Sequence, residues 1–152
     1  MVKHLLNITL ITSVFMILGC TDNIRSFPSR SEQGASLLHH RTWNLTHIGT
    51  LEFRPESGHK MPSMQFDQTH MRFSGFDGCN RIMGTYQING QNIQIGPSAG
   101  TKMMCHNNQQ LTIRFNNALS KVTSFRASGH TLKFLDRQGQ LLLQFEATVQ
   151  PR

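Results

Sequence analysis

The sequence lacks the short motifs by which common enzyme classes are recognised. It has no Gly-x-Ser-x-Gly elbow, no phosphate-binding loop and no His-Glu-x-x-His zinc motif. Its carboxylates beyond the amino-terminal region are dispersed rather than paired: Glu52, Glu56, Asp67, Asp77, Asp136 and Glu146. Asp77 stands beside Gly78, which is typical of a turn residue rather than a general base. We therefore expect that the protein is not an enzyme and needs no cofactor.

No apolar run is long enough to span a membrane as a helix. The longest, from Leu5 to Leu18, has about fourteen residues, whereas a spanning helix needs about twenty. Lys3 precedes this run and Gly19-Cys20 ends it, an arrangement that resembles the lipobox of bacterial lipoproteins. We predict that residues 1–19 are a signal peptide and that Cys20 carries acyl chains such as palmitate. The alternative is an ordinary signal peptide with Cys20 in a disulfide.

Lipid on Cys20 would make the membrane a partner, because two or more acyl chains hold a protein on a bilayer stably. Thr21, rather than Asp, follows the cysteine, and its resemblance to enterobacterial sorting signals favours the outer membrane, with the domain facing the periplasm. The rest of residues 20–36 is polar and includes Pro28 and Gly34, so we expect a flexible tether there. As a random coil it would reach about 20 to 25 Å.

Acidic residues are scarce, because eight Asp and Glu face fifteen Lys and Arg and leave a formal net charge of +7. Such a balance attracts anionic surfaces, for instance lipid headgroups or acidic cell-wall polymers. The basic residues form no run of five, however, so a generic solvated surface is the favoured interpretation. Nucleic acid is not an expected partner. His39 and His40 could sense pH or metal, although exposed histidines of the tether and loops are the more common case.

The sequence contains only three cysteines. With Cys20 lipidated, Cys79 and Cys105 remain in an oxidising compartment, where a disulfide between them is the simplest outcome. The bond would close a loop of about 27 residues and stabilise the domain by about 3 to 4 kcal/mol. A metal site with His106 or His70 is less favoured, because the cysteines do not stand in the paired short spacing of zinc sites. We expect no metal.

Alternating apolar residues predict a series of short strands. They fall at residues 43–48, 64–66, 71–73, 86–88, 93–95, 125–127, 132–134 and 141–145. Turns are expected between them at 67–69, 128–129 and 136–139. Asn89-Gly90 gives the strongest hairpin signal, since this pair suits a two-residue turn. Strands joined by such short turns indicate an antiparallel sheet.

One helix is predicted after Pro97. Its apolar residues recur at helical spacing: Leu111, Phe115, Ala118, Leu119 and Val122. Asn107 or Asn108 is placed to cap its start. A lone helix must bury its apolar side, so this side is expected to pack on the sheet. We predict one α+β domain over residues 37–150, with a curved antiparallel sheet or cracked β-barrel and one packed helix.

An ordered set of motifs in this domain resembles the META domain of the HslJ type. The set contains Trp43-x-Leu45, Gly78-Cys79-Asn80, Gly84-x-Tyr86, Thr101-x-Met103-Met104-Cys105, the helix and the Leu-rich final hairpin. Both cysteines of the predicted disulfide fall at motif positions, which favours a joint structural role. The insert at residues 52–62 and the basic balance are not part of the motif. Members of the family are typically bacterial envelope lipoproteins, some linked to heat-shock or antibiotic tolerance, and their biochemical activity is generally undefined.

The resemblance implies a non-enzymatic outer-membrane lipoprotein that binds an envelope partner or supports stress tolerance. The family fold also resembles the cracked barrel of some type III secretion pilotins. The alternative is therefore a pilotin-like chaperone that binds an acyl chain or a secretin peptide. Eight methionines could line an adaptable groove for such a ligand, although packing in an ordinary core is the favoured interpretation of them.

Overall fold

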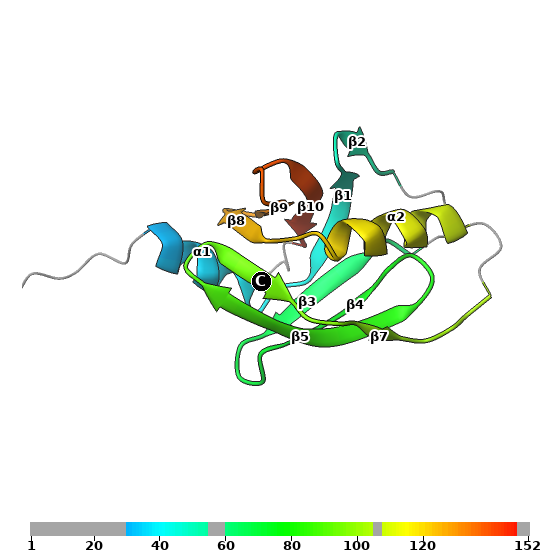
Figure 1. The fold of residues 1–152 in the computed structure, drawn as a ribbon, viewed down its shortest axis with the longest axis horizontal. Helices are drawn as coiled ribbons and strands as arrows, with labels where there is room; N and C mark the ends of the chain where they lie inside the picture. The colour runs from blue at the N-terminus through cyan, green and yellow to red at the C-terminus, as the bar shows by residue number, and fades with distance from the viewer. Residues whose placement is uncertain (1–29, 55–59, 105–107, 149–152) are drawn as a thin grey trace, which may run out of the picture.

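The computed structural model of the chain describes residues 30–54, 60–104 and 108–148. Its elements, drawn in Figure 1, are α1 (Arg30–Leu38), β1 (Trp43–Ile48), β2 (Leu51–Glu52), β3 (Ser63–Asp67), β4 (Arg72–Phe76), β5 (Arg81–Asn89), β6 (Asn92–Ile95), β7 (Ala99–Gly100), α2 (Gln109–Leu119), β8 (Ser124–Ser128), β9 (Thr131–Leu135) and β10 (Leu141–Ala147). Neither helix within these ranges has the length and apolar character that crossing a membrane requires.

Eight of the ten strands close into an antiparallel barrel. The ring runs β1-β3-β4-β5-β6-β8-β9-β10 and returns to β1, while β2 and β7 add short pairings to β1 and β5. The weakest seam lies between β6 and β8, where the register pairs only Asn92 with Ser124. The prediction of a single domain with a curved antiparallel sheet is confirmed. The domain is mostly β, and its barrel is closed rather than cracked, because β1 pairs with β10.

The barrel interior is filled by large side chains. An eight-stranded barrel is just wide enough for side chains to occupy its centre. The largest of those almost fully buried are Trp43, Phe66, Phe73, Tyr86, Phe115, Phe125, Phe134 and Phe145. Phe66 meets Tyr86 and Phe134 edge to face, with ring centroids 5.2 and 6.0 Å apart. Such contacts add to the burial energy of the rings, so the interior is a packed core.

The helix α2 occupies the region where the sequence predicts one. Its residues Phe115, Ala118 and Leu119 are buried in the same core cluster as the strands, and the Phe115 ring stands edge-on to that of Phe145 on β10. Asn108 precedes the first turn, but its side chain does not cap the helix. It donates instead to the carbonyl of Gly78, at 3.1 Å. The capping prediction is therefore wrong for Asn108, and its alternative, Asn107, lies outside the described residues.

The strand predictions hold, with two differences in the turns. Asn89 pairs with Asn92, so the two-residue loop is Gly90–Gln91 rather than Asn89–Gly90, with Gly90 at φ 61° in the first loop position. A positive φ at that position alone is the pattern of a type II′ turn, which favours glycine there. Met71 belongs to the β3–β4 turn, with φ 51°, and is exposed. Its predicted alternation with Phe73 into the core is therefore wrong.

A helix replaces the last part of the predicted tether. Residues 30–36 belong to α1, which lies against β8 (Figure 1). Ala35 packs on the core and Leu38 is fully buried, and residues three apart share one side of a helix. The indole N–H of Trp43 donates to the carbonyl of Leu38 at 2.9 Å, which fastens the end of α1 to β1. Cys20, the signal peptide and the rest of the tether lie outside the described residues.

Candidate functional site

The motif residues meet around the β4–β5 turn. Asp77, 1% exposed, accepts the backbone N–H groups of Cys79 and Asn80 at 2.9 and 2.6 Å through Oδ1. Its Oδ2 accepts the side-chain amide of Asn116 on α2 at 2.9 Å. Because every one of these donors belongs to the turn or to the helix beside it, Asp77 is the turn residue that the sequence predicts, and it also fastens the turn to α2.

Asn80 and Thr101 extend this network to the segment after β7. The Oδ1 atom of Asn80 accepts the N–H of Met103 at 2.9 Å. Thr101 accepts the N–H of Arg81 through Oγ1 at 3.1 Å and donates its own N–H to the carbonyl of Arg81 at 3.0 Å. Gly78 has φ 102°, which favours glycine. The structure thus brings Gly78, Asn80 and Thr101 together, and their contacts hold backbone in place.

Cys79 lies within this cluster, 6% exposed and disulfide-bonded. Its Sγ is 3.4 Å from the carbonyl oxygen of Met103, two residues before Cys105 in the chain. Cys105 and Cys20 both lie outside the described residues, so the pairing of Cys79 with Cys105 stays a prediction. Within the described ranges, no three His, Cys, Asp or Glu side chains gather closely enough to hold a metal ion.

The other motif residues do not join the cluster in the same way. Trp43 is fully buried in the barrel. A Cβ on Gly84 would lie 2.6 Å from the ring of Phe73 and 2.9 Å from the carbonyl oxygen of Pro97, so only glycine fits there. Met104 is 89% exposed, and Met83 and Met103 are exposed as well. The interpretation of the methionines as core residues is therefore wrong for most of those described, with Met64 as a buried exception.

The surface opens into a cleft at the other end of β4. Its volume is about 1130 Å³, and it is lined by the α1–β1 connection, the outer side of the β3–β4 hairpin, β5, the β8–β9 turn and the end of β10. The side chains of the lining that bear or can bear charge are His40, Arg41, Asp67, Arg72 and His130. They come from segments far apart in the sequence, which explains why no sequence motif indicated the cleft.

Two arginines give the cleft a positive charge. Arg41 donates through Nη1 to the carbonyl of Gly129 at 2.7 Å, and its Cζ lies 6.0 Å from the centroid of the Trp43 ring. Arg72 is exposed and faces Asp67 across the β3–β4 register. Among the described residues, ion pairs join only Arg54 to Glu52 and His70 to Asp67. Neither arginine of the cleft is therefore neutralised by a carboxylate of the described chain.

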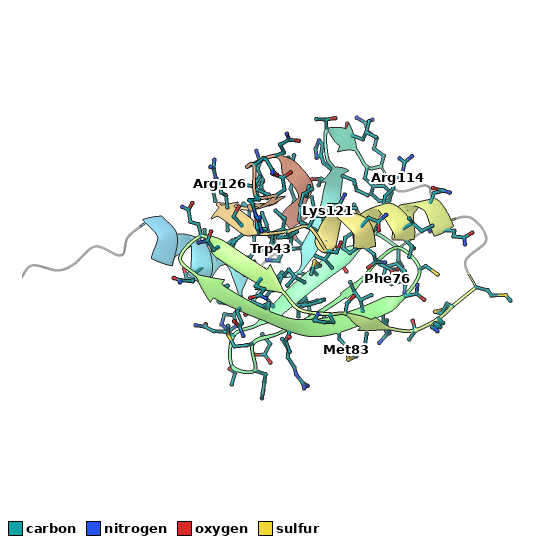
Figure 2. The ribbon with its side chains drawn as sticks, viewed as in Figure 1. Trp43, Phe76, Met83, Arg114, Lys121 and Arg126 are labelled. Atoms are coloured by element: carbon teal, nitrogen blue, oxygen red, sulfur yellow. The ribbon has the colours of Figure 1, made fainter. Side chains whose placement is uncertain are left out.

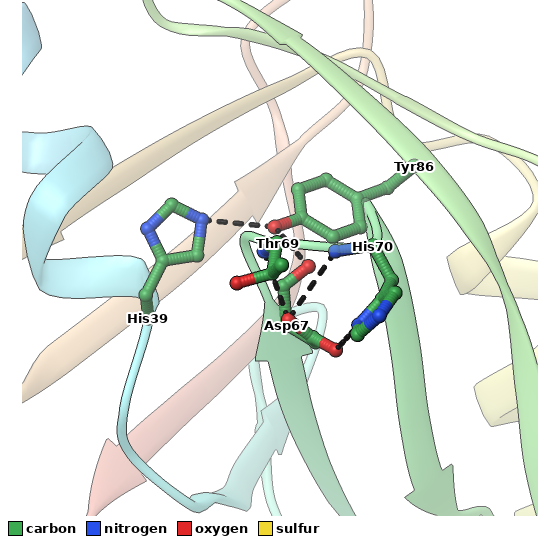
Figure 3. A network of polar contacts seen from close by, with 5 residues as sticks. All are labelled: His39, Asp67, Thr69, His70 and Tyr86. Carbon is green, nitrogen blue, oxygen red and sulfur yellow. Dashed lines mark hydrogen bonds and ion pairs between the residues drawn. The ribbon is translucent and has the colours of Figure 1, made fainter.

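Asp67, the one carboxylate on the lining, is held within its own turn (Figure 3). Its Oδ1 accepts the N–H groups of Thr69 and His70 at 2.9 and 3.4 Å, and its Oδ2 lies 2.6 Å from Nδ1 of His70. The hydrogen bond from the His70 ring is the main cause of a lowered pKa of Asp67. The carboxylate is thus ionised at neutral pH, and its charge is engaged by His70 rather than by the arginines.

His39 and Tyr86 form a buried pair behind this turn (Figure 3). Nε2 of His39 lies 2.9 Å from the Tyr86 hydroxyl, which donates to the carbonyl of Asp67 at 3.2 Å. A phenol has one proton, so with this assignment Nε2–H of His39 donates to the Tyr86 oxygen and Nδ1 carries no proton. That Nδ1 is buried and has no hydrogen-bond partner in the described structure. The expectation of an exposed histidine is therefore wrong for His39, which is 6% exposed.

Burial keeps this pair neutral. Desolvation lowers the pKa of His39, the nearby His40 lowers it further, and Asp67 opposes them. Desolvation is also the main cause that raises the pKa of Tyr86 to about 12, with the charge of Asp67 adding to it. Both rings are therefore uncharged near neutral pH, and together they join the end of α1 to the β3–β4 turn.

Backbone strain is concentrated beside the cleft. In the described chain only two residues other than glycine have positive φ, His40 at 60° and Met71 at 51°. His40 lines the cleft, and Met71 immediately precedes Arg72. A left-handed conformation costs an ordinary residue about 1 to 2 kcal/mol, and such strain clusters at functional sites. Together with the unneutralised arginines, the strain makes the cleft the candidate functional site.

Solved structures share this fold. A protein from Burkholderia xenovorans, solved by NMR, is 20% identical, with a TM-score of 0.62 over 99% of this chain and 100% of that one. A duf4847 family protein from Bacteroides vulgatus, solved by crystallography, is 16% identical, with a TM-score of 0.54 over 76% of this chain and 98% of the other. Among curated proteins no relative matches. The META domain family matches residues 36–149, three quarters of the sequence, and the chain therefore belongs to the META domain family.

Proposed function

We propose that the protein is an exported, lipid-anchored member of the HslJ type that acts as a non-enzymatic binding module of the bacterial envelope, most simply at the outer membrane. The observation that carries the proposal is the open cleft at one end of a barrel whose interior is filled. An exposed concavity with unneutralised arginines offers a surface for a ligand, whereas a filled barrel offers no room inside.

The position of the cleft fits a membrane anchor. Cys20 ends the apolar run of residues 5–18, and α1 begins ten residues later at Arg30. The chain then leaves α1 at Leu38 and enters the cleft lining at His40. An anchor at Cys20 would therefore hold this end of the barrel closer to the membrane than the motif end.

The polar groups of the motif support binding rather than catalysis. Asp77, the most buried carboxylate of the described chain, is engaged by two backbone N–H groups and by Asn116. A general base must be within hydrogen-bond reach of a substrate proton, and these contacts leave Asp77 directed into its own turn. Asn80 and Thr101 are engaged in the same way.

A pilotin-like chaperone is the alternative, and the barrel interior disfavours its simplest form. An acyl chain inside the barrel would need the space that Phe66, Phe134 and their neighbours occupy. A secretin peptide would have to bind on the outside, where the cleft offers a concavity. Both forms of the proposal therefore depend on the same cleft.

Mass spectrometry of the mature amino-terminal peptide tests the anchor directly. The expected peptide begins at Cys20 and carries the added mass of the acyl chains, and the Cys20→Ser variant is expected to remain unprocessed or to leave the membrane fraction. A native peptide with an unmodified thiol would contradict the proposal.

Site-specific crosslinking in intact envelopes tests the binding module. A photoreactive amino acid at Ser74, which lines the cleft, is expected to crosslink to a partner, whereas the same group at Arg114 on α2 serves as the matched control. Equal crosslinking at the two positions would count against the cleft as the binding surface.

A further inference from the structure

We propose that the cleft binds the phosphates of anionic lipid headgroups, so that the α1 end of the barrel rests on the bilayer that holds Cys20. The proposal rests on the proposed function, because it takes the lipid anchor as given, and it adds the ligand of the cleft and the orientation of the domain. The ligand chemistry is that of a phosphate ester in a fluid bilayer surface.

The length of chain between the anchor and α1 limits where the cleft can lie. Ten residue steps separate Cys20 from Arg30. Whatever their conformation, they span at most about 33 to 36 Å, and as a random coil they would span about 16 to 19 Å. The helix α1 has nine residues, so it adds about 13 Å before the chain reaches His40. The cleft lies where this short connection enters the barrel.

The charges at the cleft complement a phosphate surface. Arg41 and Arg72 are permanent cations with no carboxylate within ion-pair distance in the described chain. The single carboxylate of the lining, Asp67, is engaged by His70 and by two N–H groups of its turn. Its negative charge is therefore partly compensated, and the cleft keeps a positive potential at its mouth.

Arg41 is prepared to bind a phosphate. The carbonyl of Gly129 takes one N–H of its guanidinium, and its Cζ lies over the Trp43 ring, 6.0 Å from the centroid. A planar guanidinium held in this way still presents other N–H donors, and arginine binds phosphate oxygens in pairs of hydrogen bonds. The fixed side chain loses little conformational freedom when the ligand binds.

The strain at His40 is explained by the same ligand. His40 follows the end of α1 in a left-handed conformation, a position where glycine is the usual residue. The imidazole at this place contributes an N–H donor to the cleft lining, which glycine would not. His130 brings a second imidazole to the lining from the β8–β9 turn.

Hydrogen exchange on vesicles tests the proposal with the acylated, full mature protein. The protein is reconstituted into vesicles of phosphatidylcholine alone or of phosphatidylcholine with phosphatidylglycerol, and exchange is measured for peptides covering residues 39–42, 67–72 and 128–131. Each arginine at an anionic surface favours binding about fivefold, and the cleft has two. Exchange in these peptides is therefore expected to slow about tenfold or more on the anionic vesicles. Raising the salt concentration is expected to reverse the effect, because ions screen the attraction.

Two variants with the same charge change separate the cleft from general attraction. Arg41→Gln with Arg72→Gln is expected to abolish the protection. Arg114→Gln with Lys121→Gln is expected to keep it, because Arg114 on α2 and Lys121 just after it are exposed and lie above Met83, which lines the cleft (Figure 2). Arg41 also donates to the carbonyl of Gly129, so its replacement could disturb the fold. A second variant, His40→Gln with Arg72→Gln, changes only exposed side chains. It is expected to lose the protection in the same way.

Each other outcome overturns a stated part of the argument. Equal protection on both kinds of vesicle, or an equal loss in the α2 variant, would overturn the cleft as a headgroup site. Protection by inorganic phosphate in the absence of anionic lipid would assign the cleft to a free anion and overturn the bilayer as its source. The mass of the amino-terminal peptide, read in the same experiment, tests the acyl anchor separately. If the acyl mass is absent, flotation of the full chain with anionic vesicles still tests the cleft.

Discussion

The two ends of β4 use polar side chains in opposite ways. At the β4–β5 turn, Asp77 accepts the N–H groups of Cys79 and Asn80 and the side-chain amide of Asn116 on α2, while Asn80 and Thr101 accept the N–H groups of Met103 and Arg81. Cys79, within this turn, is buried and disulfide-bonded. At the other end, Arg41 and Arg72 line a cleft, and no carboxylate of the described residues forms an ion pair with either of them. The five residues of β4 separate the two arrangements by about 17 Å.

The difference teaches which residues define the family and which could define the ligand. The turn that carries the motif is a fixed structural joint, because removing the Asp77 carboxylate leaves donors in a buried place unsatisfied. The cleft end contains strain at His40 and a buried Nδ1 of His39 that has no hydrogen-bond partner among the described residues, features that stability alone does not favour. Membership of the family therefore says little about what the cleft binds.

The largest expected effect comes from Asp77→Ala. The change leaves two backbone N–H groups without an acceptor in a buried place and leaves the amide of Asn116 only the carbonyl of Thr112, which is expected to lower the free energy of unfolding by about 4 kcal/mol. Urea unfolding measures the loss. The matched control is Asp67→Ala, because Asp67 accepts two N–H groups in the same way at an exposed turn. Similar losses for both variants would contradict the contrast between the ends.

The disulfide of Cys79 gives the next largest effect. If its partner is Cys105, Cys79→Ala and Cys105→Ala are each expected to lower the free energy of unfolding by about 3 kcal/mol, and the double variant is expected to lose no more. Reduction of the wild-type protein is expected to give the same loss. Thermal unfolding with and without reductant measures it, and unequal single losses would argue against the pairing.

At the cleft end, pH is the better probe. The folded pKa of His39 lies below its ordinary value of 6.5, so the unfolded chain binds a proton that the folded one does not. Stability is therefore complete above pH 6.5 and is expected to fall as the pH drops below it. His39→Gln should flatten this slope. A slope that is unchanged in the variant would assign it to other histidines.

Tyr86 is expected to govern the dependence of stability on pH at the alkaline side. Its folded pKa of about 12 lies above the ordinary value of 10.0, so the unfolded chain loses its proton first and stability is expected to fall as the pH rises above 10. The protein has one tyrosine, so the absorbance of tyrosinate reports this residue alone. A titration midpoint near 10 in the folded protein would contradict the buried pair.

Much of the fold could be predicted from local pattern. Alternation located the strands of the ring, because one side of each strand faces the core. The closure of the ring depends on the pairing of β1 with β10, whose residues are about a hundred positions apart, and no local pattern contains that information. The helix α1 was missed because Ala35 and Leu38 give it a short apolar side within a polar segment.

The residues around the motif could be predicted from the sequence, whereas those of the cleft could not. The resemblance indicated Gly78, Asn80 and Thr101, and the structure brings them together through short contacts near one turn. The cleft could not be predicted, because its charged residues come from separate elements and become neighbours only when the barrel closes. The burial of His39 is likewise a tertiary effect, since it depends on how α1 meets Tyr86 on β5.

The smallest effects on stability are expected from changing one residue of positive φ at each end of β4, and the two effects are expected to have opposite signs. His40→Gly removes the strain of a left-handed residue and is expected to stabilise the protein by about 1 kcal/mol, as urea unfolding would show. Gly78→Ala, the matched change at the motif turn, is expected to destabilise it, because φ is 102° there and the new Cβ would lie 2.8 Å from Cδ2 of Leu111. If glycine at position 40 gives no gain, the strain at His40 is offset by contacts of the folded protein itself. A gain accompanied by weaker protection on anionic vesicles would instead show that His40 is retained for the ligand at the expense of stability.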